Sequence, residues 1–170
     1  ADGRKAELPK ELRTLSEPRD LKLCEEAAAW KFEKNTGEGS VVTGKVDGRN
    51  VLTVNFDFSK SKSKQIPYVL ASTAIDVNEG SSLVFKMRCE KGQRVTIRLT
   101  DGTGQTLQFK RKFKQGGEWE EVRIPFNRKM EHWGGANDGK VHLPLKSFCV
   151  SVPKSASVSG KVELSDVMVK

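Results

Sequence analysis

Short runs in which every second residue is apolar limit most strongly which folds this chain can adopt. A strict period of two places alternate side chains on one face of a β-strand. Four such runs occur, at residues 52–58, 83–89, 95–99 and 107–113. The links EKGQ and DGTG separate the last three runs and contain the glycine and aspartate typical of tight turns. We therefore expect antiparallel strands joined by hairpin-like links, each with one apolar face.

The same pattern continues to the last residue and predicts an all-β fold. Further strand candidates lie near Trp30 and Leu70 and begin at Glu118, Lys146 and Lys161. Roughly eight to ten short antiparallel strands with little helical periodicity indicate a β-sandwich, with a closed barrel as the less favoured alternative. A chain of 170 residues has room for one such domain, which we place at residues 27–170.

Residues 1–26 differ from the rest, because they are rich in charge and interrupted by prolines. They predict a charged arm or linker in which Leu8, Leu12 and Leu15 hint at one short amphipathic turn. The sequence begins with Ala1, without an apolar leader. Removal of a signal peptide would explain this beginning, and so would a deliberately chosen start of the sequence. We expect a secreted, extracellular or periplasmic protein.

The net charge of +8 favours anionic partners such as acidic polysaccharide, nucleic acid or a negatively charged surface. For most individual lysines, simple solvation is the alternative. The three cysteines, Cys24, Cys89 and Cys149, have no zinc or redox spacing. They favour isolated thiols over a single disulfide.

Enzymatic motifs are mostly absent. The sequence contains no G-x-S-x-G elbow, P-loop or H-E-x-x-H helix. A nucleophile and base would have to be Cys149 with His132 or His142, although a cysteine inside an apolar strand is usually inert. A lyase or hydrolase acting on an anionic glycan would need His132, His142 or Tyr68 as its base. Catalysis is the least favoured function.

The polar face of the strands gives a stronger hypothesis. By alternation, the outward positions carry basic, hydroxyl and amide side chains, and Trp119 falls among them. If these strands share one sheet, that sheet would present Lys86, Arg88, Arg94, Thr96, Arg98, Thr100, Thr106, Gln108, Lys110, Lys112, Trp119, Glu121 and Arg123. An aromatic ring stacks on a sugar while arginine and glutamine bind hydroxyls or carboxylates. Two solvated outer faces in a basic sandwich are the structural alternative.

The segment EHWGGANDGKVH, from Glu131 to His142, concentrates two histidines and three glycines. Its Asn-Asp-Gly sequence and its glycines predict a turn-rich crossover, and the ligand spacing disfavours zinc. His132 and Trp133 remain at the rim of this loop. Trp133 either packs on the edge of the sandwich or forms a second surface for sugar stacking.

The order of WKFEKNTGEGSVVTGKVDGRNVLTVNFDF, GEWEEVRIPF, PLKSFCVSV and GKVELSDVMV resembles galactose-binding-like jelly rolls. Such domains occur as carbohydrate-binding modules of polysaccharide-degrading enzymes, and the sequence is also similar to the complex I intermediate-associated protein 30 family. This resemblance implies a jelly roll that binds glycan on a concave sheet or in end loops. It further implies one structural calcium ion, with Glu33 and Asp166 at the positions of its carboxylate ligands.

We therefore predict a non-catalytic carbohydrate-binding module or accessory domain for a polysaccharide or oligosaccharide, with an anionic glycan as one option. The candidate ligand-binding residues are Tyr68, Arg88, Arg98, Lys110, Trp119, Arg123, His132 and Trp133. A glycan-degrading enzyme domain is the expected associate, and neither nucleic acid nor a membrane span is expected. A protein-interaction or structural domain with a basic docking face is the alternative.

Overall fold

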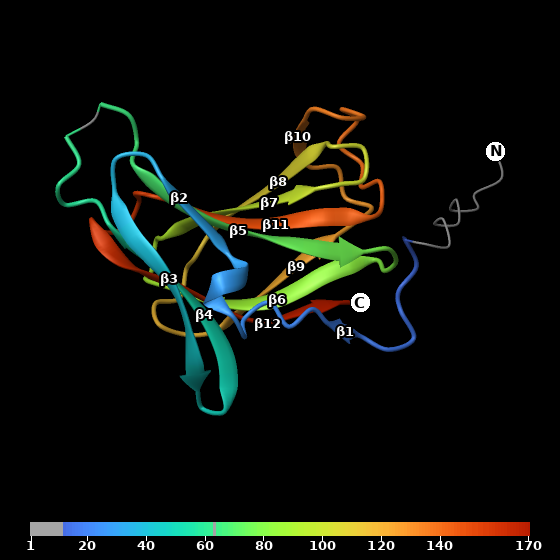
Figure 1. Ribbon diagram of the computed structural model, residues 1–170, viewed down its shortest axis with the longest axis horizontal. Helices are drawn as coiled ribbons and strands as arrows, with labels where there is room; N and C mark the ends of the chain where they lie inside the picture. Colours follow the sequence, from blue (N-terminus) through green and yellow to red (C-terminus); the bar gives the residue numbers. More distant parts are fainter. Residues whose placement is uncertain (1–11, 63) are drawn as a thin grey trace.

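The computed structural model describes residues 12–62 and 64–170, which form two antiparallel sheets packed face to face (Figure 1). Sheet A has the order β3 (Glu38–Val46), β4 (Arg49–Asp57), β12 (Ser159–Val169), β6 (Ser82–Arg88) and β9 (Glu120–Pro125), with β1 (Arg19–Asp20) beside β12. Sheet B has the order β10 (Glu131–Trp133), β8 (Thr106–Lys112), β7 (Arg94–Thr100), β11 (Leu145–Pro153), β5 (Tyr68–Val77) and β2 (Lys31–Lys34). A 3₁₀ turn, η2 (Ala27–Ala29), precedes β2.

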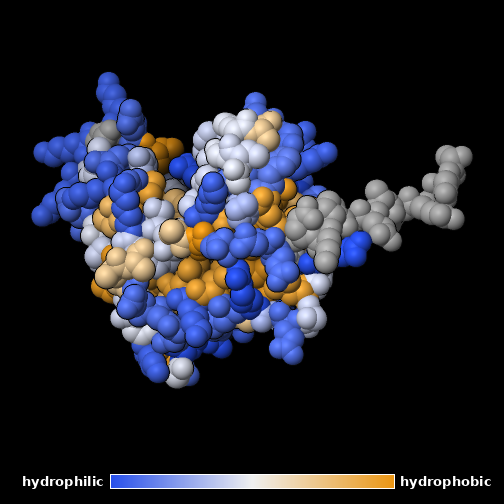
Figure 2. Space-filling view, turned by 45° about the vertical axis from the view of Figure 1, so that its right-hand side comes forward, coloured by the Kyte–Doolittle hydropathy of each residue, from blue (hydrophilic) through white to orange (hydrophobic). Residues whose placement is uncertain are grey.

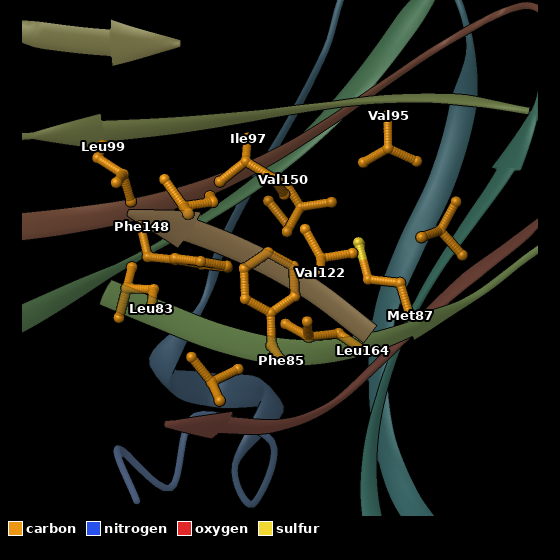
Figure 3. Close-up of a cluster of buried hydrophobic side chains, with 14 of the residues drawn as sticks. Leu83, Phe85, Met87, Val95, Ile97, Leu99, Val122, Phe148, Val150 and Leu164 are labelled. Carbon is orange, nitrogen blue, oxygen red and sulfur yellow. The ribbon is translucent and has the colours of Figure 1, made fainter. Parts of the chain in front are cut away.

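The core lies between the sheets and includes most of the residues that the alternation places on the apolar faces (Figure 3). Phe85 of β6 and Phe148 of β11 meet edge to face, with ring centroids 5.5 Å apart, and so join the two sheets. Trp30 also packs edge to face against Phe148, with ring centroids 6.1 Å apart. The expected all-β sandwich is confirmed.

The described part of the chain contains twelve strands, more than the eight to ten expected from the sequence. Two of them are too short for a pattern to detect, because β1 spans two residues and β10 three. No helix in this part of the chain is long and apolar enough to cross a membrane.

Part of the predicted arm belongs to the sandwich. β1 pairs with β12, through Arg19 opposite Val169. Leu21 and Leu23 pack against the core, and Cys24 is buried within it. Residues 1–11, including Leu8, lie outside the described residues. The sandwich therefore includes chain on the arm side of the predicted boundary at residue 27.

The polar positions do not share one sheet, and that expectation was wrong. The link EKGQ does not close a hairpin between β6 and β7, because β6 pairs with β9 and β12 in sheet A while β7 pairs with β8 and β11 in sheet B. The link DGTG does join a paired hairpin, β7 with β8. The alternation of apolar residues shows which face of a strand a side chain lies on. It does not show which other strand pairs with that strand, because pairing depends on residues far away in the chain.

Candidate functional site

Three rows of side chains cross the outer face of sheet B. They follow from the register of the paired strands, in which every second residue faces outward. One row is Trp133, Thr106, Thr100 and Ser147; the second is Glu131, Gln108, Arg98, Cys149, Ser72 and Lys31; the third is Lys110, Thr96, Ser151, Leu70 and Glu33. Large polar and aromatic groups stand over β8 and β10, whereas the three β11 side chains in these rows, Ser147, Cys149 and Ser151, are small. Figure 2 shows a hollow at the top of the molecule, on the side where Figure 1 places this face.

The centre of this face is a connected polar network beside an aromatic ring. The guanidinium of Arg98 lies over the ring of Trp133, 5.5 Å from its centroid. Arg98 Nε donates to Gln108 Oε1 at 2.9 Å, and Gln108 Nε2 donates to Glu131 Oε2 at 2.7 Å. Lys110 Nζ lies 3.4 Å from the same carboxylate. The hydrogen bond from Gln108 and the nearby Lys110 hold the pKa of Glu131 below its usual value.

The loop that follows Trp133 is held by a buried amide. The side chain of Gln105, inaccessible to solvent, accepts hydrogen bonds from the backbone N–H groups of Asp138 and Gly139, at 3.0 and 2.9 Å. Its Nε2 donates to Asp101 Oδ2 at 3.0 Å and to the carbonyl oxygen of Lys140 at 2.9 Å. The turn between β7 and β8 and the loop after β10 therefore form one hydrogen-bonded unit that fixes Trp133 at the edge of sheet B.

Both histidines belong to this turn structure. His132 Nδ1 lies 2.9 Å from Asn137 Oδ1, and His142 Nε2 lies 2.7 Å from Asp138 Oδ2. Because it alternates with Glu131 and Trp133, His132 faces away from the outer surface of sheet B. The predicted role of His132 in ligand binding therefore lacks support from this geometry. The prediction of a turn-rich crossover is confirmed.

Two carboxylates stabilise the same unit. The pKa of Asp138 is lowered to about 2, first by the backbone N–H of Lys140 and next by the side chain of His142. Burial raises the pKa of Asp101, but hydrogen bonds from Thr103 and Gln105 outweigh it and hold this pKa below its usual value. Within residues 12–62 and 64–170, no group of three or more His, Cys, Asp or Glu side chains has a geometry that could hold a metal ion.

Tyr68 also lies on the outer face of sheet B, at the end of the face opposite Trp133. It pairs with Pro153 at the start of β5, and its backbone N–H donates to Asn35 Oδ1 at 2.8 Å. Tyr68 is 36% exposed and Trp133 is 46% exposed, so both rings are accessible at this surface. Of the predicted ligand-binding residues, sheet B thus brings together Tyr68, Arg98, Lys110 and Trp133.

Two other predicted residues, Arg88 and Trp119, form a separate cluster on sheet A. Arg88 makes a two-point ion pair with Glu163, with its Nε and Nη2 at 3.0 and 2.8 Å from the two carboxylate oxygens. Its guanidinium lies 4.5 Å from the ring centroid of Trp119, and that of Arg49 lies 5.6 Å from it. Arg123 is exposed on the edge strand β9. Trp119 therefore contacts arginines of sheet A, on the opposite side of the sandwich from Trp133.

The two predicted calcium ligands do not fit a shared ion. Glu33 lies on β2 at the edge of sheet B, with its carboxylate 3.1 Å from Lys31 Nζ. Asp166 lies on β12 in sheet A, with its carboxylate 3.4 Å from Arg49 Nε. Each carboxylate already faces a cation, and the two belong to different sheets. A calcium site built on this pair is not supported.

All three cysteines are free, which confirms the expectation of isolated thiols. Burial raises the pKa of Cys24 and Cys89 to about 12 and that of Cys149 to about 11. Cys149 lies on the outer face of sheet B, while both histidines are engaged in the loop by Asn137 and Asp138. The disfavoured pairing of Cys149 with a histidine therefore has no support from this geometry.

Sequence reasoning did not select Gln108 and Glu131 as site residues. Gln108 was among the outward positions, two residues from Lys110, so its facing was available from the alternation. Glu131 becomes part of the site only because β10 pairs with β8 and places Glu131 opposite Gln108. A three-residue strand gives no pattern from which that pairing could be predicted.

A two-sheet sandwich of this kind is the fold of several carbohydrate-binding modules. The family 11 carbohydrate-binding module of a cellulosomal cellulase from Clostridium thermocellum matches with a TM-score of 0.67 and 13% identity, over 92% of this chain and 95% of that one. The same family 11 module in complex with a β-1,3-1,4-mixed-linked tetrasaccharide matches with a TM-score of 0.65 and 14% identity, over 89% and 94% of the two chains.

A family 27 module described for specific mannan recognition matches with a TM-score of 0.57 and 16% identity, over 92% of this chain and 96% of that one. At such low identity these likenesses establish the fold. No protein-family model matches the chain. No curated protein is significantly similar to it in sequence.

Proposed function

We propose that this chain is a non-catalytic carbohydrate-binding module that binds a polysaccharide or oligosaccharide on the outer face of sheet B. One observation carries the proposal. Tyr68 and Trp133, the two aromatic residues among the most exposed large hydrophobic side chains of the described chain, lie on this one face. The sandwich shared with structurally similar carbohydrate-binding modules supports it.

The chemistry of the face suits a sugar. A pyranose ring offers C–H groups that pack on an aromatic ring, and hydroxyls that need hydrogen-bond partners of both kinds. Trp133 supplies the ring, Arg98 and Lys110 supply donors, and Glu131 supplies an acceptor. Because these groups are already linked, their side chains lose little freedom when a ligand binds.

The partner and the location follow from this role. We infer that the module works outside the cytoplasm, in the extracellular space or periplasm, beside a glycan-degrading domain. An exo-β-agarase matches this chain over 89% of its length with a TM-score of 0.53, and the match covers 24% of that enzyme. A module of this fold can thus form a minor part of such an enzyme. The resemblance to the complex I intermediate-associated protein 30 family remains a prediction from the sequence.

The test is binding to a panel of neutral and acidic polysaccharides, measured by affinity electrophoresis and then by calorimetry with the best ligand. Trp133→Ala should weaken binding by about 1–2 kcal/mol, because it removes the stacking ring from an exposed position. The variant should keep the far-ultraviolet circular dichroism and the melting temperature of the parent protein.

Trp119→Ala distinguishes the two faces of the sandwich. If sheet B binds the glycan, Trp119→Ala should retain the affinity of the parent protein, since Trp119 packs under Arg49 and Arg88 on sheet A. A loss of binding in Trp119→Ala together with full binding in Trp133→Ala would move the site to sheet A. No retention of the folded protein by any polysaccharide would contradict the proposed function itself.

A further inference from the structure

A second feature of sheet B lies at the end of its outer face farthest from Trp133. A groove of about 630 Å³ is lined there by β7, β8, Ile66 and the chain after β11. The basic residues along it are Arg94, Lys110, Arg111, Lys112 and Lys154, and no aspartate or glutamate of the described residues lines it. We call this feature the basic groove.

The charges of the basic groove are poorly compensated. Arg111 is paired with Glu120 at 3.2 Å, and Lys110 lies 3.4 Å from Glu131. Arg94, Lys112 and Lys154 have no ion pair with an acidic residue among the described residues, and all three are exposed. Exposed cations concentrated along one concave surface raise the local concentration of anions.

The strand register places two of these cations opposite each other, which lowers the stability of the fold. Arg94 and Lys112 are direct cross-strand partners in the pairing of β7 with β8, and both side chains face outward. Like charges directly opposite each other destabilise a sheet. By contrast, Arg88 meets the carboxylate of Glu163, and Arg49 meets that of Asp166. An uncompensated pair beside a groove therefore points to an external anion.

The position of the groove limits what that anion can be. Along β8, Lys112 is six residues from Thr106, the neighbour of Trp133, a separation of about 20 Å in an extended strand. Glu131 lies near the Trp133 end and would repel an anionic group there. One ligand that spans the face would thus place an uncharged ring on Trp133 and its anionic group in the basic groove.

We infer that the basic groove binds the anionic substituents, sulfate esters or carboxylates, of an acidic polysaccharide chain that lies along sheet B. The inference rests on the proposed function and adds the charge class of the glycan. Arg94 provides the planar donor pair that matches a carboxylate or sulfate, and Lys112 and Lys154 act as point charges.

The test uses polysaccharides of one backbone with different charge. Polygalacturonate and its fully methyl-esterified form differ in carboxylate, and dextran sulfate and dextran differ in sulfate. The double variant Arg94→Gln with Lys112→Gln should bind the preferred acidic member about tenfold more weakly, because two charged contacts are lost. The control, Lys45→Gln with Lys161→Gln, removes the same charge from sheet A and should bind like the parent protein.

The outcomes separate this inference from the proposed function. The pattern that supports both is a loss of affinity for an acidic glycan in the groove variant, with Trp133→Ala weakened as well and steeper salt dependence in the parent than in the groove variant. Unchanged binding in the groove variant, with Trp133→Ala still defective, would overturn the inference alone. Equal losses in the groove variant and its control would also overturn it, because net charge would then explain the binding. Tighter binding of a single-stranded oligonucleotide than of every polysaccharide would overturn both.

Discussion

The environment of single residues decides which of them can act on a ligand. Two guanidinium groups lie over the ring of Trp119, whereas one lies over the ring of Trp133, which is 46% exposed. Cys149 shares the outer face of sheet B with Trp133, yet its thiol stays neutral because burial raises its pKa to about 11. At this scale the face has the character of a recognition surface, and its sulfur is not poised as a nucleophile.

The thiols provide the first prediction at the residue scale. At pH 8 the native protein should react only slowly with a thiol reagent such as Ellman's reagent, because the pKa values of Cys24, Cys89 and Cys149 lie at about 12, 12 and 11. Cys149 should react first, as the only one of the three that is not fully buried. The urea-unfolded chain, in which all three are accessible, serves as the control. A rapid stoichiometric reaction of the native protein would contradict this account.

The loop after β10 shows how one element positions the site. Gly135 has a φ of +49°, and a Cβ atom at this position would lie 2.6 Å from Thr103 Oγ1 and in direct conflict with the backbone nitrogen of Gln105. Gly104 also has a positive φ, of +83°, but a Cβ atom there would meet open space. Alanine at position 104 would therefore suffer backbone strain alone, whereas alanine at position 135 would suffer both backbone strain and a steric clash.

We predict that Gly135→Ala destabilises the protein more than Gly104→Ala does. Gly104→Ala should cost about 1 kcal/mol, the price of a positive φ for alanine. Gly135→Ala adds a clash with backbone atoms and should cost about 2–4 kcal/mol, or displace the loop. Urea denaturation gives both free energies of unfolding. Equal costs for the two variants would show that the loop does not pack on the β7–β8 turn as described.

The pH dependence of the same loop follows from Asp138. Its pKa of about 2 lies below the value of about 3.9 for an unfolded aspartate, so its hydrogen bonds stabilise the loop above pH 4. This contribution is lost as the pH falls from about 4 through about 2. The indole N–H signal of Trp133 in NMR spectra should report the loss. Asp138→Asn should already show the low-pH position of that signal at pH 6.

The elements also show how far the sequence could predict this molecule. Alternation correctly placed Leu83, Phe85 and Met87 in the core, because the facing of a side chain depends on local geometry alone. It did not reveal that β6 and β7 belong to different sheets, since strand pairing depends on residues far away in the chain. For this reason Trp119 was grouped with Arg98. Trp133 was found from its glycine-rich loop, whereas Glu131 required the pairing of β10 with β8.

At the scale of the whole molecule, the two outer faces differ in character. The outer face of sheet B carries exposed aromatic rings, a row of small side chains over β11 and a groove lined by cations. On sheet A, Arg88 forms an ion pair with Glu163, whose carboxylate is almost fully buried. The guanidinium of Arg88 also packs on the ring of Trp119. The sandwich therefore has one face with accessible binding groups and one on which comparable groups bind each other.

The domain boundary gives a prediction at this scale. A chain that begins at residue 27 lacks β1, the buried Cys24 and the carbonyl of Leu23, which accepts the hydrogen bond from Trp30 Nε1 at 2.8 Å. It should be several kcal/mol less stable than a chain that begins at residue 12, since each buried apolar side chain contributes about 1.5–3 kcal/mol. Thermal unfolding of the two chains measures the difference. Equal melting temperatures would restore the boundary at residue 27.

The pairing of β1 with β12 also determines how the domain responds to mechanical force. The two strands are antiparallel, with Arg19 opposite Val169, so the chain before β1 and the chain after β12 leave the sandwich from the same end of the pair. Tension applied to the two ends of the chain would then open the pair one hydrogen bond at a time, which requires little force. β12 remains held by β4 and β6 on both sides. The segment with β1 can therefore extend under load as a short tether while the rest of the sandwich stays folded.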